Sequence, residues 1–138
     1  MDLIVVDTSA LMAVLLNEPD TQQIADRLAE ADRRLMSAAN YVEFGAVLSG
    51  RNPGEPMHVN QDINQFISAA GIEIAPVTVE LARTALTARI RWGKGFGSPA
   101  GLNFGDCFAY ALAKSEAAPL LFVGDDFSKT DLLAALQR

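Results

Sequence analysis

Short apolar runs alternate with segments of helical periodicity along almost the whole chain, and this alternation is the feature that most limits the possible fold. The runs expected to form strands are Leu3–Val6, Arg34–Ser37, Ile72–Val77 and Leu120–Val123. The segments expected to form helices are Ala10–Leu16, Asp20–Glu30, Tyr41–Leu48, Val59–Ala70, Val79–Trp92, Phe104–Ala113 and Thr130–Leu136. Strands that alternate with helices predict an α/β fold, with a mostly parallel sheet covered on both faces. The chain of 138 residues has the length of one domain, and we expect residues 1–138 to form one.

The rarity of histidine and cysteine excludes several kinds of catalytic site. The sequence has one histidine, His58, so zinc sites built from several His and Cys side chains are excluded by ligand count. A Ser-His-Asp triad would have to use His58, which lies in the polar stretch MHVNQD and is otherwise explained as a solvated side chain. Cys107 has no second cysteine to pair with, and nothing around it indicates an activated thiolate. Chemistry must therefore come from carboxylates, hydroxyls and amides.

Hydropathy, cysteine content and charge limit where the protein acts and what it binds. No apolar run approaches the roughly 20 residues that a membrane span needs, and no basic segment at the N-terminus indicates a signal peptide. Together with the single cysteine, this predicts a cytoplasmic protein without a membrane partner. The net charge of -6 disfavours a nucleic-acid ligand, unless several acids converge on a metal ion and leave the remaining surface less acidic.

Aspartates follow two of the expected strands. Asp7 comes directly after the first strand, and Asp125 and Asp126 follow the last one in the sequence LLFVGDD. In open parallel sheets the active crevice lies beyond the carboxyl ends of the strands, so we expect these acids at one edge of the sheet. Structural explanations stay open. Asp7 would also cap a helix that starts near Ala10, and the later pair would also form a turn before a helix capped by Ser128.

Two further acids lie near the starts of expected helices. In NYVEFGAVL, Asn40 can cap a helix whose third position is Glu43, and in NFGDCFAYAL the same relation joins Asn103 to Asp106. Both pairs match a capping box, in which the acid satisfies backbone N–H groups and the helix dipole. Each acid is flanked by strongly apolar residues, which is not typical of a solvated surface. Capping and a role in a site therefore both stay open for Glu43 and Asp106.

Taken together, the acids of four separate segments predict a metal site. Like charges brought together repel and raise one another's pKa, and a bound cation removes that cost. All-oxygen ligation suits Mg²⁺ or Mn²⁺, which keep waters and meet phosphate oxygens. Such an ion activates water and stabilises a phosphate transition state. Two ions would stabilise both the attacking and the leaving oxygen of the reaction. Thr8 and Ser9 follow Asp7, and a hydroxyl there would bond to the carboxylate, hold a metal-bound water or cap the helix.

The segment of residues 82–104 carries the opposite charge. It contains no acid and four basic residues, Arg83, Arg89, Arg91 and Lys94, of which the last three are our candidates for binding substrate. The segment then becomes rich in glycine and leads directly to Asp106. A flexible basic loop beside an acidic metal site suits a polyanionic substrate, and Trp92 and Phe96 would stack on bases. The alternative is that the charges solvate one helix face while Trp92 packs in the core.

Four segments resemble the signature motifs of PIN-domain ribonucleases, and specifically of the VapC toxins of bacterial type II toxin–antitoxin systems. They are IVVDTSALMAVLLNEPD, SAANYVEFGAVL, GLNFGDCFAYALA and LLFVGDDFSKTDL. The resemblance covers essentially the whole chain. It implies a PIN-like three-layer α/β/α fold with a central parallel sheet of four or five strands. It also implies Mg²⁺- or Mn²⁺-dependent endonucleolytic cleavage of RNA, by attack of a metal-activated water on the phosphodiester.

The same resemblance implies partners. VapC toxins are neutralised by a cognate VapB-type antitoxin, which inserts a segment into the toxin groove and obstructs the site. The complex binds operator DNA through the antitoxin. A homodimer is implied as well. The RNA that is cleaved, the number of metal ions and the kind of antitoxin stay open.

Carried over residue by residue, the resemblance assigns four acids to metal binding and catalysis: Asp7, Glu43, Asp106 and Asp125. Asp126 is the alternate for the fourth position. Many relatives have Thr-x-Asp at the end of the last strand, whereas this chain has Gly-Asp-Asp-Phe, and we favour Asp125 as the aspartate that points inward. Ser9 matches the supporting hydroxyl of the first motif.

Three other functions share parts of this pattern. An aspartyl-phosphate phosphatase uses a strand-end aspartate as nucleophile, but needs a second acid two residues later, where this chain has Ser9. A receiver domain also has a phosphoacceptor aspartate in an acidic pocket, with the acids in a different order, and phosphorylation by acetyl phosphate would identify it. A non-catalytic PIN fold that only binds an antitoxin is the third alternative, which an activity test separates.

Overall fold

The structure is a computed structural model that describes residues 1–51 and 56–137. Residues 52–55 and 138, which belong to the domain expected over 1–138, lie outside the described part. The elements in chain order are β1 (Leu3–Val6), α1 (Thr8–Leu15), α2 (Thr21–Glu30), β2 (Arg33–Ser37), α3 (Ala38–Arg51), α4 (Pro56–Ala69), β3 (Ile72–Ala75), α5 (Val79–Trp92), α6 (Phe104–Glu116) and β4 (Leu120–Leu121). This alternation confirms the α/β class. No helix within the described ranges is long and apolar enough to cross a membrane.

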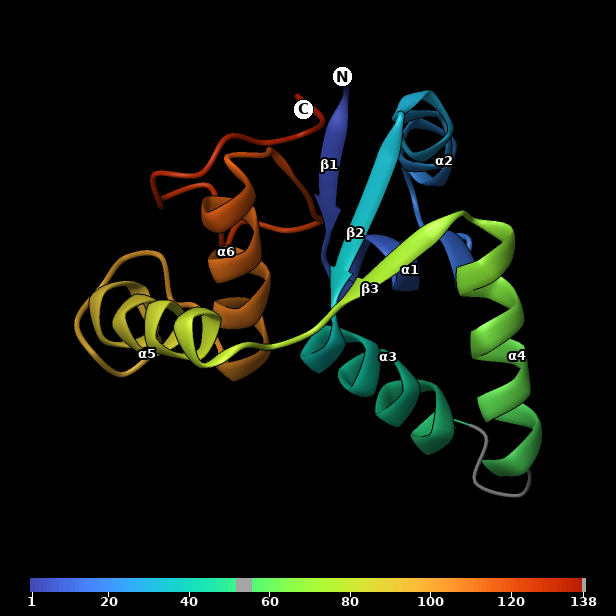
Figure 1. Cartoon of the computed structure of the whole chain (residues 1–138), viewed down its shortest axis with the longest axis horizontal. Helices are drawn as coiled ribbons and strands as arrows, with labels where there is room; N and C mark the ends of the chain where they lie inside the picture. The colour runs from blue at the N-terminus through green and yellow to red at the C-terminus, as the bar shows by residue number, and fades with distance from the viewer. Residues whose placement is uncertain (52–55, 138) are drawn as a thin grey trace.

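The four strands form one parallel sheet in the order β3-β2-β1-β4. In the centre of the sheet, Val5 of β1 lies opposite Leu35 of β2 on one side and Leu120 of β4 on the other. Figure 1 shows β1 and β2 side by side, with β3 crossing at the outer edge. Because all strands run in one direction, their carboxyl ends meet at one edge of the sheet. Asp7 lies at this edge, where its backbone N–H donates to the carbonyl of Leu121 at 3.0 Å.

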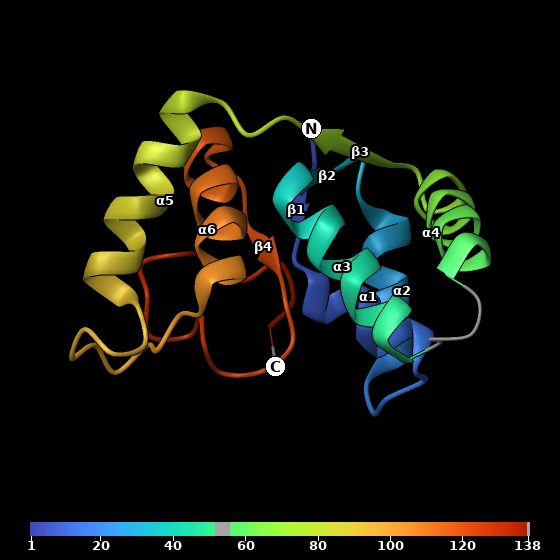
Figure 2. The same cartoon turned by 90° about the horizontal axis from the view of Figure 1, so that it is seen from below.

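Helices cover both faces of the sheet, which confirms the three-layer arrangement. The side chains of Ile4 and Val6 pack in one core cluster with α1, α2, α3 and α4. Val5, between them in sequence, points to the other face and packs in a second cluster with α5 and α6. Figure 2 shows α5 and α6 on one side of the strands and the four earlier helices on the other. Burial on both faces explains why the strands read as continuous apolar runs.

Element boundaries differ from the sequence-based expectations in a few places. Helix α5 has the predicted bounds, whereas β3 ends at Ala75, before Pro76, and β4 ends at Leu121. Helix α1 begins at Thr8 because the Asp7 side chain already caps it. Helix α3 begins at Ala38 rather than Tyr41, directly after β2, which leaves no room for a separate cap between the two elements.

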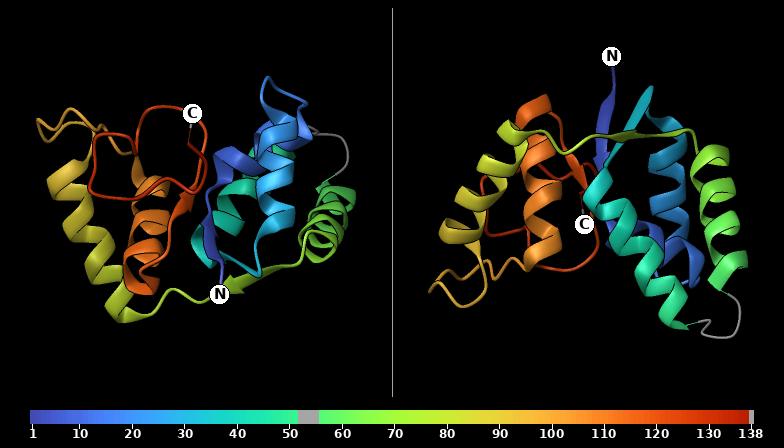
Figure 3. Two further views of the ribbon diagram at one scale, coloured as in Figure 1. Left: turned by 90° about the horizontal axis from the view of Figure 1, so that it is seen from above. Right: turned by 60° about the horizontal axis from the view of Figure 1, so that its bottom comes forward.

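The C-terminal helix expected over Thr130–Leu136 is absent, and that prediction is wrong. The segment is extended and lies along the free edge of β4 (Figure 3). The N–H of Leu120 donates to the carbonyl of Leu133 at 2.9 Å, and the N–H of Ala135 donates to the carbonyl of Leu120 at 2.8 Å. Pairing with the sheet edge satisfies backbone groups on both segments, whereas a seven-residue helix would leave those of β4 unpaired.

A side-chain network holds this extended segment against the helices. Asp131 accepts hydrogen bonds from the Tyr110 hydroxyl at 2.6 Å and from Lys114 Nζ at 3.0 Å. The Tyr110 hydroxyl in turn accepts from Trp92 Nε1 at 3.3 Å. Because the described residues after it form no helix, the interpretation of Ser128 as a helix cap is also wrong. Asp131 instead fixes the segment to α6.

Candidate active site

Asp7 is a buried carboxylate with one oxygen satisfied and one left free. Its side chain is 3% exposed. Oδ2 accepts the backbone N–H of Ser9 at 3.0 Å and the Ser9 hydroxyl at 2.6 Å, which makes Asp7 the N-cap of α1. Oδ1 is buried and accepts no hydrogen bond from any described residue. Burial raises the pKa of Asp7 to about 6, against the hydrogen bonds from Ser9. The capping role is confirmed, but it explains the contacts of only one of the two carboxylate oxygens, Oδ2.

Two hydroxyls after Asp7 connect α1 to neighbouring elements. Ser9 Oγ, which donates to Asp7, accepts the N–H of Val123 at 3.0 Å and so ties the start of α1 to the chain after β4. Thr8 Oγ1 donates to the carbonyl of Asn40 at 3.2 Å, in α3. The expected bond between a hydroxyl and the Asp7 carboxylate is therefore present, and it is made by Ser9.

Asp106 lies in the first turn of α6 and faces two other acids. The capping box is confirmed: Asp106 Oδ2 accepts the N–H of Asn103 at 3.0 Å, and the N–H of Asp106 donates to Asn103 Oδ1 at 2.9 Å. Burial, and to a smaller extent the nearby charges of Asp7 and Asp126, raise the pKa of Asp106 to about 8, against the hydrogen bond from the Asn103 N–H. A cap alone would lower the pKa, so burial and the acids near this carboxyl outweigh the effect of the cap.

The two aspartates after β4 have different surroundings. Gly124 adopts φ +100, a left-handed conformation that favours glycine, and the chain turns there. Asp126 lies near Asp106 and its charge raises the pKa of that carboxyl, whereas Asp125 lines a hollow together with Phe122. The sequence-based preference for Asp125 stays a prediction, and the contact with Asp106 favours its alternate, Asp126.

Glu43 reaches the site from α3 and lies over the first turn of α6. Asn40, which is fully buried, does not cap α3, because it lies in the third position of the helix; that interpretation is wrong. Its Nδ2 instead donates to the carbonyl of Gly105 at 2.9 Å and to Glu43 Oε1 at 3.3 Å. The Glu43 carboxylate also contributes a charge that raises the pKa of Asp7.

Asn40 and Gly105 are positioning residues that sequence reasoning missed. A Cβ at Gly105 would overlap the Glu43 carboxylate, so glycine leaves the space that this acid occupies. Asn40 Oδ1 is buried and accepts no hydrogen bond from the described residues. The glycine directly before Asp106 in the sequence NFGD was the available signal, because a helix interior otherwise disfavours glycine.

We expect Gly105→Ala to weaken Mn²⁺ binding by about tenfold or more, because the added methyl group displaces the Glu43 carboxylate. Alanine favours a helix over glycine, so the metal-free variant should unfold at the same temperature or higher. Titration with Mn²⁺ and thermal melting measure the two effects. Gly50→Ala in α3 is the matched control, since its Cβ would meet no heavy atom within 4 Å. Equal Mn²⁺ affinity in the Gly105 variant would contradict the role given to Glu43.

The donor set fits a hard divalent cation. In the part of the chain that the structure describes, no three His, Cys, Asp or Glu side chains form a preformed metal-binding group. The acids interact in pairs instead, Asp7 with Glu43, Asp7 with Asp106, and Asp106 with Asp126. Carboxylates without a cation share protons and keep apart. The unpartnered Oδ1 of Asp7 and the all-oxygen chemistry match Mg²⁺ or Mn²⁺.

The basic segment has both structural and exposed members. Arg89 Nη1 donates to the carbonyls of Lys94 and Leu102, both at 2.9 Å, and the guanidinium lies 5.4 Å from the Phe96 ring centroid. Arg89 therefore holds the glycine-rich loop together. Trp92 packs against the second core cluster, as the structural alternative expected.

The other three basic residues of this segment are exposed. Arg91 and Lys94 are exposed, and the Arg91 guanidinium lies 4.5 Å from the Trp92 ring centroid. Phe96 is 55% exposed.

Cys107 of α6 is buried, and burial raises the pKa of its thiol to about 11. Its Sγ donates to the carbonyl of Asn103 at 3.3 Å. It is a small core residue, as expected.

Comparisons with known proteins show the family of the chain. A family model described as PIN domain matches residues 4–133. Ribonuclease VapC28 of Mycobacterium tuberculosis is 45% identical over 134 residues, which cover 97% of this chain and 98% of that protein. A ribonuclease VapC of Mycolicibacterium smegmatis is 42% identical over 130 residues, covering 94% and 98%.

Solved structures share the fold at low sequence identity. The crystal structure of Mycobacterium tuberculosis VapC20, named a sarcin-ricin loop cleaving toxin, matches with a TM-score of 0.72 and 17% identity over 94% of this chain and 96% of that one. A toxin–antitoxin complex from Klebsiella pneumoniae matches with a TM-score of 0.71 and 15% identity over 98% and 99%.

Proposed function

The chain belongs to the PIN-domain family and, within it, to the VapC group, and from this membership we propose that it is the ribonuclease toxin of a toxin–antitoxin pair. It would act in the cytoplasm as one domain over residues 1–138, cleaving RNA phosphodiesters with the help of Mg²⁺ or Mn²⁺. The names of its curated relatives as ribonucleases support the reaction class.

One observation carries the catalytic part of the proposal. A buried carboxylate, Asp7, has an oxygen without a hydrogen-bond donor and is within electrostatic reach of Asp106, whose pKa is raised to about 8. An arrangement that keeps acids together without a basic partner is destabilising for the fold alone. A site that binds a cation explains why the chain tolerates it.

The side chains then have separate tasks. Asp7, Glu43 and Asp106 would hold the ion, with Asp126 as the fourth acid. Bound there, Mg²⁺ or Mn²⁺ lowers the pKa of water and neutralises phosphate charge. Ser9 occupies Oδ2 of Asp7 with two hydrogen bonds, so Oδ1 is the oxygen available to a ligand.

Positioning residues set the distance between the two helices that carry these acids. Asn40 spans from α3 to the Gly105 carbonyl of α6 and holds Glu43 with the same amide group. Fixed in this way, the carboxylates need little rearrangement when a substrate phosphate arrives. For binding the RNA backbone, we propose the exposed Arg91 and Lys94, with Arg89 shaping the loop that carries Lys94.

A hollow between α1, α3 and α4 has a lining that suits a segment of an antitoxin. Leu15 and Leu16, each 41% exposed at the end of α1, lie beside Leu48 and Phe66 around a hollow of about 450 Å³. Arg51 lies at its rim. We propose that an amphipathic segment of a VapB-type antitoxin docks there. Two of the similar solved structures are a toxin–antitoxin complex and a VapBC2 complex from Rickettsia felis bound to a promoter DNA fragment, which supports such a partner. The homodimer stays a prediction.

The nuclease proposal is tested by incubating the purified protein with RNA in Mn²⁺ and in excess EDTA and mapping the new ends. We expect cleavage only with the metal, with 5′-phosphate and 3′-hydroxyl products. Equal cleavage in EDTA would exclude the metal mechanism. No cleavage of any RNA in Mn²⁺, by protein that still binds its antitoxin, would support a non-catalytic binding module.

A further inference from the structure

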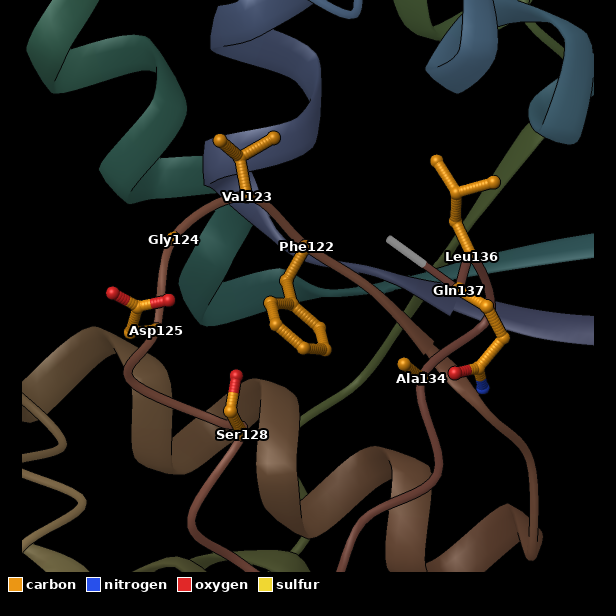
Figure 4. Close-up of a pocket in the computed structure, with 8 residues that line it drawn as sticks. All are labelled: Phe122, Val123, Gly124, Asp125, Ser128, Ala134, Leu136 and Gln137. Atoms are coloured by element: carbon orange, nitrogen blue, oxygen red, sulfur yellow. The ribbon is translucent and has the colours of Figure 1, made fainter.

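A hollow of about 400 Å³ lies between the end of β4 and the extended C-terminal segment. Figure 4 shows the residues that line the hollow. Phe122, Val123 and Asp125 belong to the segment that follows β4, and Leu136 and Gln137 belong to the C-terminal segment. The hollow exists because the C-terminal segment pairs with the edge of β4 instead of forming a helix. Its volume is at the small end of the roughly 300–1,000 Å³ range of ligand pockets, which suits one small ring system.

Two hydrogen bonds connect this hollow, through Ser9, to Asp7, one of the proposed catalytic acids. The N–H of Val123, in its wall, donates to Ser9 Oγ, and Ser9 donates to Asp7. On the same turn, the charge of Asp126 acts on Asp106 and raises its pKa, while its neighbour Asp125 lines the hollow. A nucleotide whose phosphate meets the acids would therefore have its base within reach of the hollow.

The lining combines apolar surface with a few polar groups. Phe122, Val123 and Leu136 provide apolar contact, and the Phe122 ring packs on Phe127 with ring centroids 5.1 Å apart. The polar groups are the Asp125 carboxylate, the Ser128 hydroxyl and the Gln137 amide. Among the described lining residues none is Lys or Arg, and one is acidic. Such a lining disfavours a phosphate and favours a neutral ring that donates hydrogen bonds.

We propose that this hollow is a subsite for a guanine base next to the cleaved bond, with Asp125 as the residue that determines specificity. Guanine presents the N1–H and the N2 amino group side by side, and a carboxylate accepts both with its two oxygens. Adenine and cytosine present an amino donor beside an acceptor, and uracil presents one N–H between two acceptors, so each leaves a repulsive contact. The proposal rests on the proposed ribonuclease function and names its sequence preference.

The test uses the full-length protein and short single-stranded RNAs that differ at one position on either side of the cleaved bond. That position carries guanine, or inosine, which keeps N1–H and lacks the N2 amino group. For the wild type we expect kcat/KM to be roughly tenfold higher for guanine at one of the two positions. In Asp125→Asn the guanine-to-inosine ratio should fall close to one, because the amide offers one acceptor. Glu116→Gln, an exposed acid at the other end of α6, is the charge-matched control.

A binding measurement separates this proposal from the nuclease proposal. In an Asp7→Asn background, in which no cleavage is expected, fluorescence anisotropy should show the same preference for guanine and its loss on adding Asp125→Asn. Binding that discriminates while wild type cleaves nothing would keep the subsite and overturn the nuclease function. Cleavage without a guanine-to-inosine difference would overturn the subsite alone. Loss of the Mn²⁺-induced rise in melting temperature in the single Asp125→Asn variant would also overturn it, because Asp125 would then be a metal ligand.

Discussion

Asp7→Asn is expected to reduce RNA cleavage by about a thousandfold or more and, at the same time, to make the metal-free protein more stable. The amide keeps the volume of the carboxylate and an oxygen that accepts from the Ser9 N–H and hydroxyl, so the cap of α1 survives. It removes the charge that a divalent cation needs. It also removes the cost of holding that charge in a buried position beside Glu43 and Asp106.

The expected stabilisation follows from the pKa of the buried group. The pKa of Asp7 is about 6 in the folded protein against an ordinary value of 3.8. At a pH of about 8, Asp7 is ionised in both the folded and the unfolded protein. The pKa difference then corresponds to on the order of 3 kcal/mol of lost folding stability, and the Asp7→Asn variant does not have this cost. Asp106→Asn should act in the same direction.

Chemical denaturation in EDTA and RNA cleavage in Mn²⁺ measure the two effects on the same preparation. Glu116→Gln, which removes one exposed acid from α6, should change neither. A variant that loses activity and also unfolds more easily would show that the buried charge of Asp7 does not destabilise the fold. That outcome would remove the main support for a cation site at the end of β1.

The metal-free protein is expected to lose stability as the pH rises from about 5 to about 9, which is the reverse of the behaviour of a protein held by ion pairs. Asp7 and Asp106 have folded-state pKa values of about 6 and about 8, both above the ordinary aspartate value of 3.8. Over this range the folded state binds more protons than the unfolded state. The stabilising contribution is fully present below about pH 4 and is lost as the pH passes through the two folded-state pKa values.

Acids with lowered pKa values do not obscure this effect. The pKa of Asp2 is lowered by its bond with Arg27, that of Glu73 by Arg33, and that of Asp131 by the Tyr110 hydroxyl. Their contributions change only at lower pH, because all three are ionised in both states above about pH 5. The two buried acids of the site therefore dominate the carboxyl contribution in the measured window.

Melting temperatures in EDTA and in Mg²⁺, measured across this pH range, test the prediction. Mg²⁺ should raise the melting temperature more at about pH 8 than at about pH 5, because the ion binds the ionised carboxylates and competes with protons. The Asp7→Asn, Asp106→Asn double variant should show a nearly flat profile and little response to Mg²⁺. A melting temperature of the metal-free wild type that rises with pH would contradict the raised pKa values.

Sequence periodicity was sufficient for most of the fold. Hydrophobic patterns located β1, the core of β2 and all of α5, because they depend on which faces of each segment are buried. The rule for parallel strands then placed Asp7 and the pair after β4 at one edge of the sheet. The capping box of Asp106 was also predicted, since it depends on residues three apart in the sequence.

Contacts between segments far apart in the sequence decided the rest. The C-terminal segment has helical periodicity, yet it pairs with β4, because an open sheet edge offers backbone partners that no local pattern reveals. Asn40 has the sequence context of a cap, yet it holds Glu43 and the Gly105 carbonyl of another helix. Asp125 and Asp126 are adjacent and chemically equal, and only the turn at Gly124 places the second against Asp106. Local pattern sets what each segment can bury, whereas the partner of a polar group is set by which other group the fold brings within hydrogen-bonding distance.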